Sequence, residues 1–139
     1  MSNPFEELIQ QLGKVLELEL IPDHNNAVAL KMNQKTTIQI QEDQEQNNLL
    51  IASILCELPP GRFRENVMAE ALKTNALNDP RPGNLGYLYR KNALTLHTVY
   101  PFSQLDGKQL AVYLSNFLEL AEAWLKAIER GQTGPEPRK

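Results

Sequence analysis

The stretch from Leu49 to Leu58 constrains the fold of this chain most, because it is apolar on both sides of an extended strand. Successive side chains of a strand point to opposite faces of its sheet. One face carries Leu49, Ile51 and Leu55, and the other carries Leu50, Ala52, Ile54, Cys56 and Leu58. Such a strand belongs inside a sheet, with one side on a core and the other side available to a partner.

Helical and strand periodicities alternate along the rest of the chain. Asn3, Pro4 and Glu6 are typical of a helix start, and Ser103 with Asp106 resembles a capping box. Apolar spacing predicts helices over 3–17, 62–77 and 103–130, and strands over 27–32, 37–41, 49–58, 85–89 and 93–100. The predicted fold class is α+β, in the order α-β-β-β-α-β-β-α, with a twisted antiparallel sheet packed against helices.

Length and charge limit the classes of protein that fit. The 139 residues suffice for one domain, expected over 1–130, and the Gly- and Pro-containing stretch 131–139 predicts a flexible C-terminal tail. A net charge of −3 gives no basic surface for nucleic acid or anionic lipid, and no apolar run is long enough for membrane insertion. Cys56 is the only cysteine, and the first residues do not resemble a signal peptide, so a cytoplasmic location is expected.

The sequence offers little to support catalysis. It contains no Gly-x-Gly-x-x-Gly, P-loop, Cys-x-x-Cys or His-Glu-x-x-His pattern, so no cofactor or metal is expected. An enzyme hypothesis rests only on Cys56 and His97. Cys56 lies in an apolar strand without a nearby base, and both His97, in a strand, and His24, in a polar turn, fit structural or surface roles. We therefore expect a protein that is not an enzyme.

Four segments resemble one known family. They are Leu72–Leu77 (LKTNAL), Gly83–Tyr87 (GNLGY), Ala93–His97 (ALTLH) and Tyr100–Asp106 (YPFSQLD), the last leading into a long apolar helix. Together with the opening helix, they are similar to the class I effector chaperones of bacterial type III secretion systems, the Tir chaperone family. The resemblance extends over about residues 3 to 129. The polar stretch from 39 to 48 departs from it.

The resemblance implies a cytoplasmic bacterial homodimer. It would hold the N-terminal chaperone-binding segment of a secreted effector in a soluble, non-globular form and deliver it to the secretion apparatus, whose ATPase is a further candidate partner. No nucleotide hydrolysis or metal is implied. Such binding combines strand addition at a sheet edge with apolar anchors in grooves.

Two groups of residues are predicted to carry these contacts. The first helix and first three strands supply an effector-binding hydrophobic patch, several members of which also fit a core: Leu8, Leu12, Leu20, Val28, Leu30, Ile38, Ile40 and Ile51. The resemblance places the dimer contact around the second helix and the following hairpin, at Phe63, Val67, Leu85, Tyr87 and Tyr89.

Two alternatives stay open on sequence alone. The large apolar content is explained as well by a filled core as by an interaction surface. A small dimeric regulatory or sensory protein-interaction domain would have the same α+β plan. A compact folded partner, in place of an unfolded segment, would favour that second class.

Overall fold

The computed structural model describes residues 4–32, 36–43, 45–77 and 82–135. Its centre is a five-stranded antiparallel sheet in the order β1-β2-β3-β5-β4. The strands are β1 (Ala27–Lys31), β2 (Thr37–Asp43), β3 (Asn48–Glu57), β4 (Asn84–Leu88) and β5 (Ala93–Pro101). The apolar strand β3 lies in the middle of the sheet, as its sequence predicts, and β1 and β4 form the two edges.

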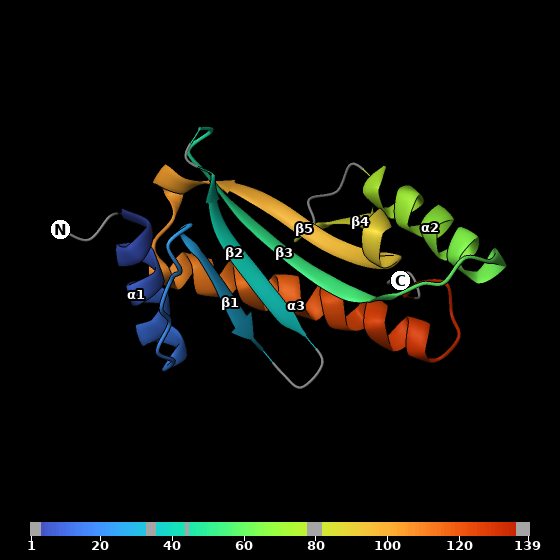
Figure 1. Cartoon of the computed structure of the whole chain (residues 1–139). Helices are drawn as coiled ribbons and strands as arrows, with labels where there is room; N and C mark the ends of the chain where they lie inside the picture. The colour runs from blue at the N-terminus through green and yellow to red at the C-terminus, as the bar shows by residue number, and fades with distance from the viewer. Residues whose placement is uncertain (1–3, 33–35, 44, 78–81, 136–139) are drawn as a thin grey trace.

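Three helices and two short 3-10 turns accompany the sheet. The helices are α1 (Pro4–Leu16), α2 (Arg62–Asn75) and α3 (Gly107–Glu129), and the 3-10 turns are Tyr89–Lys91 and Phe102–Gln104. In Figure 1 the long helix α3 lies behind the sheet, α1 lies at the β1 end and α2 lies beside β4. The predicted α+β class and element order are confirmed.

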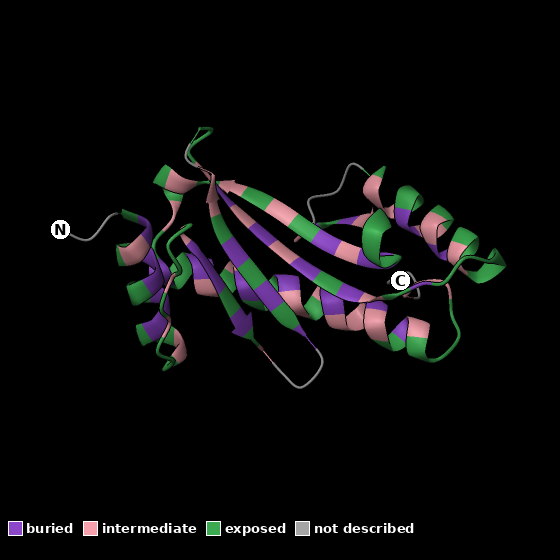
Figure 2. Ribbon diagram, in the orientation of Figure 1, coloured by how far each residue is buried: buried purple, intermediate pink, exposed green. Residues whose placement is uncertain are grey.

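One face of the sheet supports the core. Ile40 of β2, Ile51 of β3 and Leu96 of β5 are fully buried there, together with Phe5 of α1 and Phe117 of α3. Figure 2 shows the result along β2, where buried and exposed residues alternate. Alternation along each strand is the pattern of an antiparallel sheet with one dry side.

The opposite side of the central strands is covered by no helix in Figure 1, and we call it the open face. It is formed by Thr37, Gln39 and Gln41 of β2, Leu50, Ala52 and Ile54 of β3, and Thr95, His97 and Val99 of β5. Ile54 and Val99 are about half exposed, at 47% and 46%. The apolar second side of β3 is therefore available, in keeping with its sequence.

At two positions another segment passes so close to the backbone that only glycine fits. A Cβ on Gly13 would lie 2.6 Å from the carbonyl oxygen of Leu18, because the chain turns back over the end of α1. The turn passes through Glu17 at φ 58° and is closed by the Leu18 amide donating to the Gly13 carbonyl at 2.9 Å. A Cβ on Gly107 would lie 2.5 Å from Cβ of Gln11, so this glycine lets α3 start against α1.

Several predicted boundaries need correction. The N-cap of α3 is Asp106, whose carboxylate accepts from the Gln109 amide at 2.8 Å, and Ser103 lies in a 3-10 turn instead. Strand β2 continues past the predicted end at 41 to Asp43. Glu42 and Asp43 are too polar to predict a strand, but both pair with β3. The predicted cap Asn3 lies outside the described residues, as does the end of the predicted tail at 136–139. Within that tail, Gly134 lies against the Trp124 ring.

Candidate protein-binding site

The outer edge of β1 carries main-chain groups that point away from the sheet. Met32 donates to Thr36 at 3.0 Å and Glu42 donates to Asn26 at 3.1 Å, which makes the even-numbered residues of β1 the ones that bond to β2. In an antiparallel pair the intervening residues direct N–H and C=O outward. Ala27, Ala29 and Lys31 are these residues.

Of these three residues, only Ala27 has hydrogen-bond partners for its outward groups. The Ala27 amide donates to the Asp23 carboxylate at 3.1 Å, and its carbonyl accepts from the Asp23 amide at 2.8 Å. In the part of the chain that the structure describes, the outward main-chain groups of Ala29 and Lys31 have no such partner. They form a short free edge to which an extended peptide can add as another strand.

The other edge, β4, is covered by α2. The Asn75 side chain donates to the Leu85 carbonyl at 2.7 Å and accepts from the Leu85 amide at 2.9 Å, so it copies the bonds of an adjacent strand. Further along β4, Arg64 donates to the Tyr87 hydroxyl at 2.7 Å, and its guanidinium carbon lies 5.3 Å from the ring centroid. The outward groups of Leu85 in β4 are therefore bonded, whereas those of Ala29 and Lys31 in β1 are open.

Exposed apolar side chains occur close in sequence to the β1 edge. Val15 at the end of α1 and Leu18 and Ile21 in the following segment are 45%, 49% and 73% exposed. This segment leads directly into the Asp23 turn that binds Ala27, and Figure 1 shows it on the α1 and β1 side of the molecule. Large apolar side chains beside a free strand edge are the anchors that strand addition uses.

The predicted effector-binding patch is placed mainly in the interior. Seven of its members have exposed fractions of 7% or less, namely Leu8, Leu12, Val28, Leu30, Ile38, Ile40 and Ile51. They lie on the core face of the sheet and on the inner side of α1, so they are closed to a partner in this conformation. Leu20 is half-buried and packs against the same core. A binding role for this set stays a prediction.

The predicted dimer residues divide between surface and core. Phe63 and Tyr89 are exposed, at 39% and 84%, whereas Val67 and Leu85 are buried between α2 and β4. Tyr87 is half-buried, and its hydroxyl also donates to Asn92 at 2.8 Å. Their role in a dimer stays a prediction.

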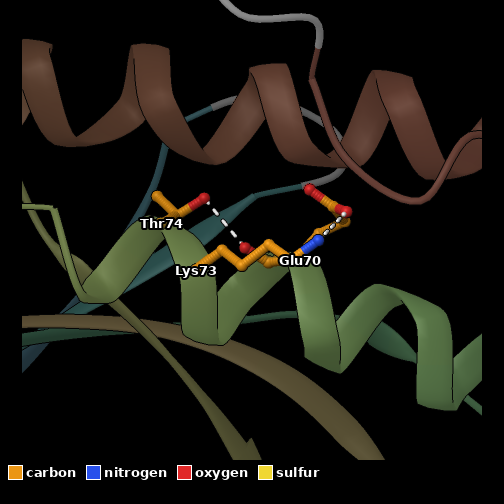
Figure 3. Close-up of polar contacts among 3 residues, drawn as sticks. All are labelled: Glu70, Lys73 and Thr74. Carbon is orange, nitrogen blue, oxygen red and sulfur yellow. Dashed lines mark hydrogen bonds and ion pairs between the residues drawn. The ribbon is translucent and has the colours of Figure 1, made fainter.

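Sequence reasoning missed two exposed leucines in the same region, Leu72 of α2 and Leu77 just after it, at 67% and 58%. The polar contacts of α2 near Leu72 are local, since Lys73 pairs with Glu70 and the Thr74 hydroxyl donates to the Glu70 carbonyl (Figure 3). Neither contact covers Leu72. The spacing of these leucines in the sequence did not show whether they would lie on the surface or in the core.

Reactive chemistry gains no support from the geometry. Burial, with a smaller contribution from Glu129, raises the pKa of the Cys56 thiol, so the nucleophilic thiolate is disfavoured. Cys56 is half-buried, and its strand neighbour across the sheet is Leu94. Within the described ranges, no group of three or more His, Cys, Asp or Glu side chains is placed to hold a metal ion. None of the helices described there is long and apolar enough to cross a membrane.

The fold and this edge together define a protein-interaction module. The family model of the Tir chaperone protein (CesT) family matches residues 7–125. The chain therefore belongs to the Tir chaperone protein (CesT) family. This confirms the resemblance found in the sequence.

Solved structures agree with this assignment. A chain in the HopA1–SchA chaperone–effector complex has a TM-score of 0.74 at 18% identity, with 89% of this chain and 94% of that chain covered. The Yersinia pestis type III secretion chaperone SycH, in complex with a YscM2 fragment, gives 0.69 at 14%, covering 85% and 97%. The ExoT–SpcS complex of Pseudomonas aeruginosa gives 0.66 at 20%, covering 88% and 97%. No curated protein matches the sequence.

Proposed function

We propose that this chain is a type III secretion chaperone that binds an extended segment of a secreted effector by strand addition at β1. The observation that carries the proposal is that the N–H and C=O groups of Ala29 and Lys31 point outward without a hydrogen-bond partner, in a chain of the CesT family. The structural neighbours come from the HopA1–SchA chaperone–effector complex and from the complex of SycH with a YscM2 fragment, which supports a protein client. The protein works by binding, in the bacterial cytoplasm, and needs no reactive side chain.

The edge geometry limits how much strand can be added. Two outward residues offer two N–H donors and two C=O acceptors, enough for about four hydrogen bonds to a client strand of roughly four to five residues. Each such bond contributes only about 0.5–1.5 kcal/mol net, so main-chain pairing by itself gives weak binding. Apolar client side chains on Leu18 and Ile21 would supply the rest, since burying one large side chain is worth about 1.5–3 kcal/mol.

A homodimer formed through α2 and the adjoining hairpin belongs to the same proposal. Phe63, Leu72, Leu77 and Tyr89 leave an apolar surface there that a second copy would cover. We expect Leu72→Glu to convert a dimer to a monomer, as measured by light scattering coupled to size exclusion. Val112→Glu, a similarly exposed apolar position on α3, is the matched control and leaves the mass unchanged.

Proline at position 29 tests the client site. Ala29 directs its N–H away from β2, so Ala29→Pro removes an outer donor without removing a ladder bond. Co-expression with proteins encoded beside the gene should give a soluble complex that Ala29→Pro weakens at least about tenfold, the equivalent of about 1.4 kcal/mol. Ala29→Val retains the donor and should retain the complex. A chain that is a strict monomer and solubilises none of these proteins contradicts the proposal.

A further inference from the structure

The chain is folded back where α3 ends. The amide of Gly131, at φ 79°, donates to the Ile128 carbonyl at 2.9 Å, and the Gln132 amide donates to the Ala127 carbonyl at 2.9 Å. These two bonds form a Schellman motif, in which a glycine in the left-handed conformation ends a helix and turns the chain. Figure 1 shows the red segment after α3 turning away from the helix axis. Its direction is therefore set by its first two residues, and we call residues 131–135 the C-terminal strap.

The C-terminal strap lies on the only tryptophan of the chain. A Cβ on Gly134 would lie 3.1 Å from Cη2 and 3.2 Å from Cζ3 of Trp124, so glycine lets the backbone rest on the edge of this ring. The tryptophan is only 2% exposed, and Thr133, Gly134 and Pro135 are half-buried. The strap therefore forms part of the cover that keeps Trp124 from water.

The same glycine also lies against α2. Its Cβ position is 3.6 Å from Cβ of Glu70, and Figure 3 shows Glu70 on the side of α2 that faces α3. Of the 14 residues of α2, all of them described, only Val67 and Ala71 are buried. The bonds of Arg64 and Asn75 to β4 lie near the two ends of the helix. The strap thus contacts the middle of a helix that has few buried side chains, and it connects that helix to α3.

The strap is held more weakly than the elements that it connects. Its half-buried residues are Thr, Gly and Pro, so it buries little apolar surface of its own. Segments with few buried apolar contacts open locally at a lower free energy than core strands do. Opening uncovers one edge of the Trp124 ring and removes the connection between α2 and α3 through the strap, while the five-stranded sheet keeps its pairing.

We propose that the C-terminal strap is a conformational latch. When docked, it covers Trp124 and holds α2 in place beside β4. When released, it exposes the ring edge and lets α2 move while the sheet stays folded. The latch does not depend on effector binding. One consequence rests on the proposed function: α2 carries Leu72 of the surface assigned to a second copy, so release of the strap should weaken the dimer.

An engineered disulfide tests the docked position. Glu70→Cys and Gly134→Cys place their Cβ atoms 3.6 Å apart, within the range of about 3.5–4.5 Å that disulfides use. The new Cβ requires a small shift of the Trp124 ring, and Cys56→Ser removes the native thiol. Mild oxidation should give an intramolecular disulfide, detected by mass spectrometry of nonreduced peptides. The matched pair with Glu65→Cys, an exposed position of α2 five residues earlier, should not form it. A strap that cross-links to both positions equally, or to neither, overturns the proposal.

A charge substitution tests the release. Gly134→Glu places a carboxylate against the Trp124 ring and beside Glu70, so the strap should leave its site. Gln132→Glu adds the same charge at an exposed position of the strap and is the matched control. Gly134→Glu should raise acrylamide quenching of the Trp124 fluorescence at least about twofold and speed amide exchange in the middle of α2 at least about fivefold, with β3 unchanged. In the cross-linked pair, α2 should exchange more slowly when oxidised than when reduced.

The outcomes distinguish the latch from the dimer. The latch is overturned if Gly134→Glu matches Gln132→Glu in quenching and in α2 exchange, or if β3 exchanges faster to the same extent as α2, which would indicate global destabilisation. Light scattering measures the mass separately, and Gly134→Glu should raise the dimer dissociation constant at least about fivefold. A parent chain that is a strict monomer contradicts the proposed dimer, while the quenching and exchange results still decide the latch.

Discussion

Asn75 is expected to be the residue that keeps the β4 edge from pairing with other strands. Its side chain makes both a donated bond of 2.7 Å and an accepted bond of 2.9 Å to Leu85, in a partly buried setting. Asn75→Ala removes the two bonds, at about 0.5–1.5 kcal/mol each, while alanine regains up to about 0.5 kcal/mol as a better helix former. The expected loss in free energy of unfolding is about 0.5–2.5 kcal/mol.

Urea denaturation at one fixed protein concentration measures this loss, because the stability of a dimer depends on concentration. The melting temperature should fall by roughly 2–10 °C. Asn75→Asp should lose at least as much stability as Asn75→Ala, since the carboxylate still accepts from the Leu85 amide but places a second acceptor oxygen against the Leu85 carbonyl. Asn66→Ala, an exposed asparagine of the same helix, is the control and should stay within about 0.5 kcal/mol of the parent.

The same variant should change association as well as stability. An uncovered edge strand pairs with other chains, so Asn75→Ala should aggregate faster than Asn66→Ala when both are held a few degrees below their own melting temperatures. Light scattering follows the aggregation. If Asn75→Ala matches Asn66→Ala in both stability and aggregation, the reasoning about the β4 edge is refuted.

Four further outcomes follow, two from the backbone and two from Cys56. Gly107→Ala should destabilise the protein by about 1–3 kcal/mol in urea, because the added methyl meets Gln11 at 2.5 Å, and an unchanged midpoint would contradict the close α1–α3 contact. Glu17→Gly should stabilise it by about 0.5 kcal/mol by relieving the left-handed conformation at φ 58°. Burial raises the pKa of the Cys56 thiol, so alkylation at neutral pH should be slower than in the urea-unfolded chain. Since the unfolded thiol ionises first, Cys56 should also make stability fall as pH rises beyond its ordinary pKa of 9.0, a slope that Cys56→Ser removes.

Local periodicity predicted the elements because it reflects burial directly. Alternation at Ile38 and Ile40, and the two-sided apolar pattern of Leu49–Leu58, located β2 and the central strand correctly. Periodicity did not show which apolar residues would be accessible. Val28 and Leu30 could face a core or a partner until the positions of α1 and α3 were known, and the structure buries both.

The edge site depends on contacts that sequence patterns do not contain. Asn75 meets Leu85 because α2 packs beside β4, and the nine intervening residues give no sign of that pairing. Asp23 was visible only as part of a turn, although it determines which outward groups of β1 remain available. The start of α3 was misplaced for a related reason, since both Ser103 and Asp106 are good caps and the contact of Gly107 with Gln11 favours the second.

Amide hydrogen exchange at the β1 edge tests the central claim most directly. The Ala29 and Lys31 amides point outward without a partner and should exchange rapidly in the free protein, whereas the Leu85 amide, bound by Asn75, should exchange slowly. Binding of a client should slow Ala29 and Lys31 by at least roughly tenfold and leave Leu85 unchanged. A bound client that leaves both β1 amides as fast as before would contradict strand addition at β1.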